Sequence, residues 1–181
     1  MTMTTKRTAL VSIFSLALIG LAGCGGGGES GGGAAPEEWP VRVTTSGDVE
    51  SALDTNGSIY CSPNDVSGPE FVFELYAMSP PRNFKLVLNR DLAVGTHPIV
   101  GSDDDARWRG ADVFTYYTGP DRQDFNRVEN GSITIESMPT ATGEAFVASV
   151  QADMLGEDGA AIQLTADVNV TAGSQSFDDC P

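Results

Sequence analysis

Two stretches of the chain gather carboxylates at spacings that can ligate a cation. Asp103, Asp104 and Asp105 are consecutive, and Asp121 and Asp124 follow a little farther on. Calcium takes six to eight oxygen ligands at irregular geometry, but neither stretch has the spacing of an EF-hand loop. Solvated turns with local pairs of aspartate and arginine are the commoner outcome of such sequences. We therefore assign no metal ligand, and a calcium-binding module remains an alternative.

Catalytic chemistry has few candidate residues. His97 is the only histidine, so a Ser-His-Asp triad, a histidine-based zinc site or a Cys-His pair would each have to use it. No catalytic motif surrounds it, and Pro98 beside it indicates a turn or a strand edge. The 25 acidic residues offer carboxylate pairs for a glycan hydrolase, but sequence spacing does not fix spacing across a sheet. We expect no catalytic residue and no cofactor, and the hydrolase remains an alternative.

Aromatic residues suggest a third chemistry, the binding of a glycan. Trp108, Phe114, Tyr116 and Tyr117 can form a platform for a sugar whose hydroxyls bond to neighbouring aspartates. In a strand, however, alternate residues point to opposite faces, so Phe114 and Tyr116 share one side and Tyr117 takes the other. One of those two sides is then expected to be core.

The N-terminal residues have the pattern of a signal peptide. Lys6 and Arg7 precede an apolar run over residues 9–21, and small residues follow it. A transmembrane helix needs about 20 apolar residues, and this run is shorter. We therefore expect the segment to be removed during export.

The residues Leu21-Ala22-Gly23-Cys24 resemble the lipobox of bacterial lipoproteins. The resemblance implies that the Cys24 thiol receives a diacylglyceryl group, that residues 1–23 are cleaved off, and that the new amine is acylated. Each buried methylene contributes about 0.8 kcal/mol, so several acyl chains hold a protein that a single chain would release. Gly25 stands where inner-membrane lipoproteins carry aspartate, which implies an outer-membrane lipoprotein facing the periplasm or the cell surface.

With Cys24 acylated, the remaining cysteines are Cys61 and Cys180. An exported protein meets an oxidising compartment, so we predict that these two form a disulfide. Closing a loop of about 100 residues stabilises a fold by about 4.7 kcal/mol in the loop-entropy model. The bridge would hold the C-terminal end against an early strand.

Charge limits the partners of the mature chain. The predicted signal carries two basic residues and no acid, so eight basic residues remain against 25 acidic ones, a formal charge of −17. Nucleic acids and anionic lipid surfaces are disfavoured, because binding them relies on lysine and arginine. A basic protein or a glycan is permitted as partner, although an acidic surface also serves solubility alone.

The remaining sequence divides into a tether and one domain. Residues 24–38 are rich in glycine and are expected to behave as a flexible tether. Residues 39–181 alternate apolar and polar side chains with period two, as half-buried strands do. We predict a single all-β domain of about nine antiparallel strands, either a β-sandwich or a small β-barrel.

Local patterns place strands and turns within this domain. The clearest strand is the segment 161–171, preceded by a second at 146–154, with Asp158-Gly159 as the hairpin turn between them. Asn56-Gly57 and Asn130-Gly131 predict two further type I′ turns. A helical turn is expected only near residues 48–53. The function class that follows is a lipid-anchored protein that binds or scaffolds and catalyses nothing.

Overall fold

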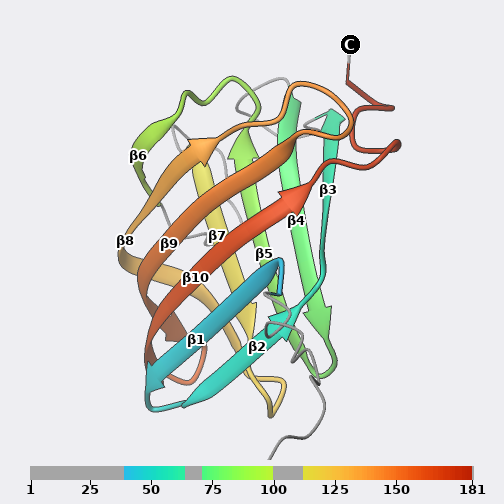
Figure 1. Ribbon diagram of the computed structural model, residues 1–181. Helices are drawn as coiled ribbons and strands as arrows, with labels where there is room; N and C mark the ends of the chain where they lie inside the picture. The colour runs from blue at the N-terminus through green and yellow to red at the C-terminus, as the bar shows by residue number, and fades with distance from the viewer. Residues whose placement is uncertain (1–38, 64–70, 100–111, 181) are drawn as a thin grey trace, which may run out of the picture. The chain divides into compact units, whose positions relative to one another are not determined.

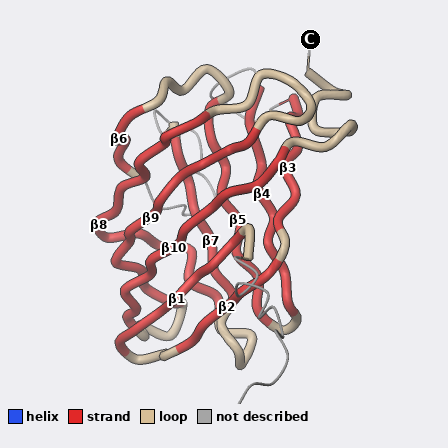
Figure 2. The backbone as a smooth tube through the Cα atoms, viewed as in Figure 1, coloured by secondary structure: helices blue, strands red, loops and turns tan. Residues whose placement is uncertain are grey.

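The computed structural model describes residues 39–63, 71–99 and 112–180, and within these ranges it contains strands and turns but no helix (Figures 1 and 2). This confirms the all-β prediction. In chain order the strands are β1 (Val41–Gly47), β2 (Ser51–Thr55), β3 (Gly57–Pro63), β4 (Phe71–Ser79), β5 (Arg82–Asn89), β6 (Gly95–Pro98), β7 (Val113–Thr118), β8 (Asp124–Ser137), β9 (Ala145–Gly156) and β10 (Ala161–Thr171).

One antiparallel sheet contains all ten strands. Its order is β2-β1-β10-β9-β8-β7-β5-β4-β3, and β6 pairs with β8 beside this path. The two end strands, β2 and β3, follow each other in the chain through Asn56, so the sheet nearly closes on itself as a barrel does. In Figure 1, β8, β9, β10, β1 and β2 form a front layer, and β7, β5, β4 and β3 lie behind them.

The predicted strand alternation and one predicted turn are confirmed. β9 and β10 pair along their whole length, and the turn at Asp158-Gly159 joins them with Gly159 at a φ of +85°. Their inward side chains are all buried: Phe146, Ala148, Val150, Ala152, Met154, Ile162, Leu164, Ala166, Val168 and Val170. These residues form one face of the central core, while their neighbours on each strand face outward.

Two other predicted turns, and the predicted helical turn, are wrong. At Asn56-Gly57 the chain does not reverse; it changes its partner from β1 to β4. Asn130-Gly131 lies inside β8, where the register with β9 shifts, so the dipeptide serves a bulge in a bent strand. Residues 51–55, where a helical turn was expected nearby, form the strand β2. Leu53 lies opposite Val43 on β1, and its side chain is completely buried in the core.

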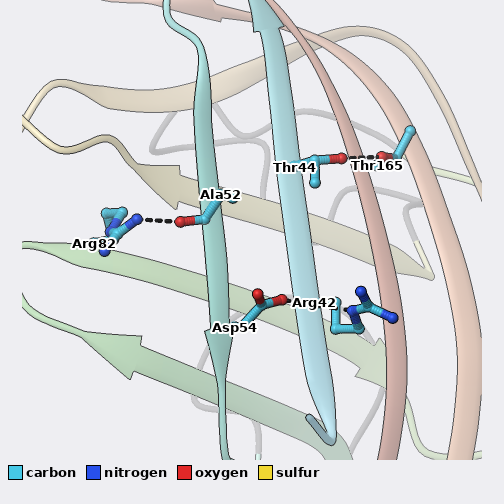
Figure 3. A network of polar contacts seen from close by, with 6 residues as sticks. All are labelled: Arg42, Thr44, Ala52, Asp54, Arg82 and Thr165. Atoms are coloured by element: carbon cyan, nitrogen blue, oxygen red, sulfur yellow. Dashed lines mark hydrogen bonds and ion pairs between the residues drawn. The ribbon is translucent and has the colours of Figure 1, made fainter. Parts of the chain in front are cut away.

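Side-chain contacts bridge the place where the sheet closes. The Arg82 guanidinium donates to the carbonyl oxygen of Ala52 on β2 (Figure 3), and the Thr55 hydroxyl donates to the Met78 carbonyl oxygen at 3.0 Å. Farther along, the free edge of β3 is covered by the C-terminal segment. There the Cys61 amide donates to the Ser176 carbonyl oxygen at 2.7 Å. Closure therefore rests on side chains and on the C-terminal segment as well as on strand pairing.

Candidate functional site

The interior of the sheet is packed with side chains. Within the described residues, the enclosed apolar void beside Ile59, Phe73, Leu75 and Phe146 measures about 10 Å³. That is about the volume that a single water molecule needs, far below the 300–1,000 Å³ or so of a ligand pocket. This void is therefore too small to hold a small-molecule ligand.

The predicted disulfide is present. Cys61 on β3 and Cys180 near the C-terminus are bonded, with their Cα atoms 5.8 Å apart. The Ser176 hydroxyl donates to the Ile59 carbonyl oxygen at 2.8 Å beside the bridge, and Phe177 packs edge-on against Phe73. The C-terminal end is thus held against an early strand, as the number of cysteines predicted. Cys24, the predicted lipidation residue, lies outside the described residues.

His97 occupies the edge position that the sequence indicated. It lies on the short strand β6 opposite Ile133, and its Nε2 is 2.7 Å from the carbonyl oxygen of Ala93. This contact fixes the ring within its own loop. Among the described residues, His97 belongs to no group of three or more histidine, cysteine, aspartate or glutamate side chains that could hold a metal ion.

The acidic stretches gather no metal-ligand set in the part of the chain that the structure describes. Asp103, Asp104 and Asp105 lie outside that part. Asp121 is exposed in the turn after β7, whereas the Asp124 carboxylate lies 2.8 Å from the Thr118 hydroxyl. No group of three or more histidine, cysteine, aspartate or glutamate side chains converges among the described residues.

The predicted aromatic platform is divided between two faces. Tyr117 is fully buried in the core, where its hydroxyl donates to the Ser51 hydroxyl at 2.9 Å. Phe114 is buried on the opposite side of β7, and Tyr116 lies partly exposed beside it. Burial raises the pKa of the Tyr116 hydroxyl, and nearby Asp124 reinforces the shift. Trp108 lies outside the described residues. The three described members do not present a shared surface to a sugar, because Tyr117 lies on the opposite side of β7 from Phe114 and Tyr116.

A polar and aromatic cluster lies on the outer face of β3, β4 and β5. The Lys85 ammonium is 2.8 Å from a Glu74 oxygen and 4.8 Å from the centre of the Tyr76 ring, and Tyr60 packs edge-on against Tyr76. Burial lowers the pKa of Lys85, but hydrogen bonds to Glu74 and Tyr76 outweigh burial and leave it raised. The Tyr76 hydroxyl also donates to Glu74 at 3.1 Å. These groups satisfy one another, so the cluster stabilises the outer face and leaves few polar atoms for a ligand.

A shallow depression on the opposite outer face offers polar groups that are not committed in this way. It measures about 380 Å³ and lies over β1, β8, β9 and β10. Its lining residues are Trp39, Pro40, Arg42, Glu136, Val147, Ala148, Ser149, Asp167, Val168 and Asn169. We call it the Trp39 depression.

Strand register explains why these residues meet. Arg42 on β1 lies opposite Asp167 on β10, and both side chains face outward. Just before β1, the Pro40 carbonyl oxygen accepts a hydrogen bond of 2.7 Å from the Asn169 amide, which extends the pairing and places Trp39 beside β10. Trp39 is 44% exposed, which makes it the most exposed aromatic residue in the part of the chain that the structure describes. The alternating sequence of β10 predicts that Asp167 and Asn169 face solvent. It does not predict that β1 pairs with β10.

Charge in the Trp39 depression is mostly negative. The single cation, Arg42, is directed to Asp54 on β2, with 3.6 Å between Nε and Oδ1 (Figure 3). The Glu136 and Asp167 carboxylates make no hydrogen bond or ion pair with other described side chains. Their oxygens therefore remain available as acceptors for a ligand that carries hydroxyl or amide donors.

Comparison with known proteins gives no relative: no protein-family model, curated protein or solved structure matches this chain. Among the described residues, no helix is long and apolar enough to span a membrane. The function must therefore be argued from the residues and the geometry given above.

Proposed function

We propose that this chain is an exported lipoprotein, anchored in the outer membrane through acyl groups on Cys24, that acts as a non-enzymatic binding module. In this proposal, residues 1–23 are the removed signal and residues 24–38 are the tether. The domain of residues 39–181 faces the periplasm or the cell surface and presents its outer faces to a glycan or a protein partner.

The disulfide between Cys61 and Cys180 is the observation that carries the proposal. Disulfides form and persist in oxidising compartments outside the cytosol, so the bridge supports export. It also uses two of the three cysteines and leaves Cys24, in its lipobox-like context, as the one thiol without a partner. The outer surface supports a role in surface binding, since it carries a depression of about 380 Å³, whereas the void in the core beside Ile59 and Phe146 measures about 10 Å³.

Metabolic labelling tests the anchor. Bacteria expressing the full chain are grown with an alkyne-bearing fatty acid, and the purified protein is coupled to a fluorescent azide. We expect a labelled band from the wild type and none from Cys24→Ser. The double variant Cys61→Ser/Cys180→Ser serves as the matched control and should be labelled like the wild type. Equal labelling of Cys24→Ser and wild type would refute the proposal.

A further inference from the structure

We infer that the Trp39 depression is a binding site for a neutral glycan. The inference rests on the proposed function, because it names the ligand class of the binding module. Asp121, Asp124 and the aromatic residues of β7 do not line this depression.

The first argument is the exposed indole. Aromatic side chains in a folded domain are mostly buried, as Phe84, Tyr117 and Phe125 are here. Trp39 instead lies at the border of a concave surface and is 44% exposed to water. A pyranose ring has an apolar face of C–H groups that packs against an aromatic ring, while its hydroxyls project sideways toward polar neighbours.

Those polar neighbours are the second argument. Asp167 and Asn169 lie two residues apart on β10 with both side chains outward, which separates their Cα atoms by about 7 Å. Glu136 on β8 lies on another side of the same depression. Two carboxylates and one amide in one depression supply both acceptors and donors for the hydroxyls of a sugar ring.

Charge selects a neutral ligand over an anionic one. Glu136, Asp167 and nearby Asp54 repel phosphate, sulfate and uronate groups, and Arg42 is directed to Asp54. A basic protein would satisfy the same charges, but the exposed indole at the border of a concave surface offers a stacking contact that suits a sugar ring. The two partners differ in salt dependence, because screening weakens an attraction between exposed charges and leaves stacking and neutral hydrogen bonds almost unchanged.

A second depression on the same sheet face serves as a comparison. It measures about 370 Å³, lies over Gly131, Gln151 and Thr165, and contains no aromatic residue. Asp153 belongs to its border and not to the Trp39 depression. Variants in the two depressions therefore distinguish a ligand that binds anywhere on the polar sheet face from a ligand that binds at Trp39.

A glycan array tests the inference with the full-length protein in non-ionic detergent. The array carries neutral cello-, xylo-, malto- and chito-oligosaccharides together with anionic hyaluronan and heparin fragments. We expect binding to at least one neutral series, with affinity nearly constant between about 50 and 500 mM salt. Trp39→Ala should weaken that binding about tenfold or more, the equivalent of one lost aromatic contact.

Matched variants complete the test. Tyr60→Ala removes the exposed aromatic of the opposite face, and Asp153→Ala removes an acid from the second depression; both should bind like the wild type. Asp167→Ala should weaken binding, and it keeps the test decisive if Trp39→Ala fails to fold by thermal melting. The inference is overturned if no neutral series binds, if Trp39→Ala and Asp167→Ala both bind normally, or if binding is confined to anionic glycans or lost steeply with salt. Cys24 labelling is independent of all these results.

Discussion

Single residues decide how the sheet closes. Gly57 is the first residue of β3, where the chain stops pairing with β1 and starts pairing with β4. It lies close to Val170 on β10. A Cβ atom at this position would lie 2.7 Å from Cγ2 of Val170 and 2.8 Å from Cγ2 of Val41, closer than real Cβ contacts allow. Both valines are buried, so neither can move away without disturbing the core.

We therefore expect Gly57→Ala to lower the free energy of unfolding by about 1–3 kcal/mol, the usual cost of overpacking a core. Denaturant titration of purified protein measures this. Gly173→Ala is the control, since the nearest atom to its new Cβ, Oγ of Ser176, would be 4.0 Å away. A Gly57→Ala protein as stable as the control would show that β2 and β3 do not approach β10 and β1 as described.

Glu144 gives the loop between β8 and β9 a dependence on pH. Its carboxylate accepts hydrogen bonds from the Thr140 amide at 2.7 Å, the Thr140 hydroxyl at 3.0 Å and the Ala141 amide at 3.2 Å. The Thr140 amide contributes most to lowering the pKa of Glu144 below its ordinary value of 4.5. A pKa that is lower in the folded state stabilises the fold above the ordinary value, and this stabilisation disappears as the pH falls through the lowered one.

We expect Glu144→Gln to reduce the loss of stability between about pH 5 and pH 3, because the variant has no carboxylate to protonate there. Unfolding free energies measured at several pH values give the slope. Glu50→Gln removes the same charge from an exposed glutamate without a described side-chain partner, and should leave the slope closer to that of the wild type. Equal slopes for Glu144→Gln and wild type would contradict the described loop contacts.

Among the elements, the C-terminal segment has the clearest separate role. It covers the free edge of β3 through the Cys61 amide, the Ser176 hydroxyl and the disulfide, whose cysteines are 119 residues apart. Unpaired edges of sheets are sites for unwanted strand pairing. The segment therefore both stabilises the fold and protects this edge.

Removing the bridge with Cys61→Ser/Cys180→Ser should lower the free energy of unfolding by about 2–5 kcal/mol, as for other native disulfides that close long loops. Denaturant titration measures the loss, and hydrogen exchange should show faster exchange of the Cys61-position amide. Ser176→Ala removes two hydrogen bonds of one hydroxyl, which donates to the Ile59 carbonyl oxygen and accepts from the Gly173 amide, and should cost less, about 1–2 kcal/mol. If the double variant were no less stable than Ser176→Ala, the segment would not depend on the bridge.

Sequence patterns predicted elements better than their connections. Alternation identified the inward face of β9 and β10 because burial imposes it on every second residue of a strand. The Asn-Gly pairs gave two wrong turn predictions. Asparagine and glycine tolerate unusual backbone geometry, and this geometry also occurs at a bulge or where a strand changes its partner. Trp39, Arg42 and Asp167 could not be grouped in advance, since their meeting depends on the pairing of β1 with β10, strands more than a hundred residues apart.

At the scale of the whole molecule, the proposed function combines a β-domain with a lipid anchor. The sheet encloses a core of buried side chains, and in the proposal its outer faces contact the ligand. An acyl anchor at Cys24 would keep those faces near a membrane, while a formal charge of −17 on the mature chain would hold the domain away from anionic head groups. Anchoring and surface recognition are then separate functions of separate parts of the chain.

We propose that the mature chain begins at an acylated Cys24 and contains one disulfide. Intact-mass spectrometry of the full protein, extracted from membranes with detergent and not reduced, tests both features in one measurement. We expect the mass of residues 24–181 plus acyl groups, lower by two hydrogens for the bridge between Cys61 and Cys180, with no thiol that reacts with an alkylating reagent. A chain that keeps residues 1–23, or that begins at Cys24 with a free thiol, would contradict it.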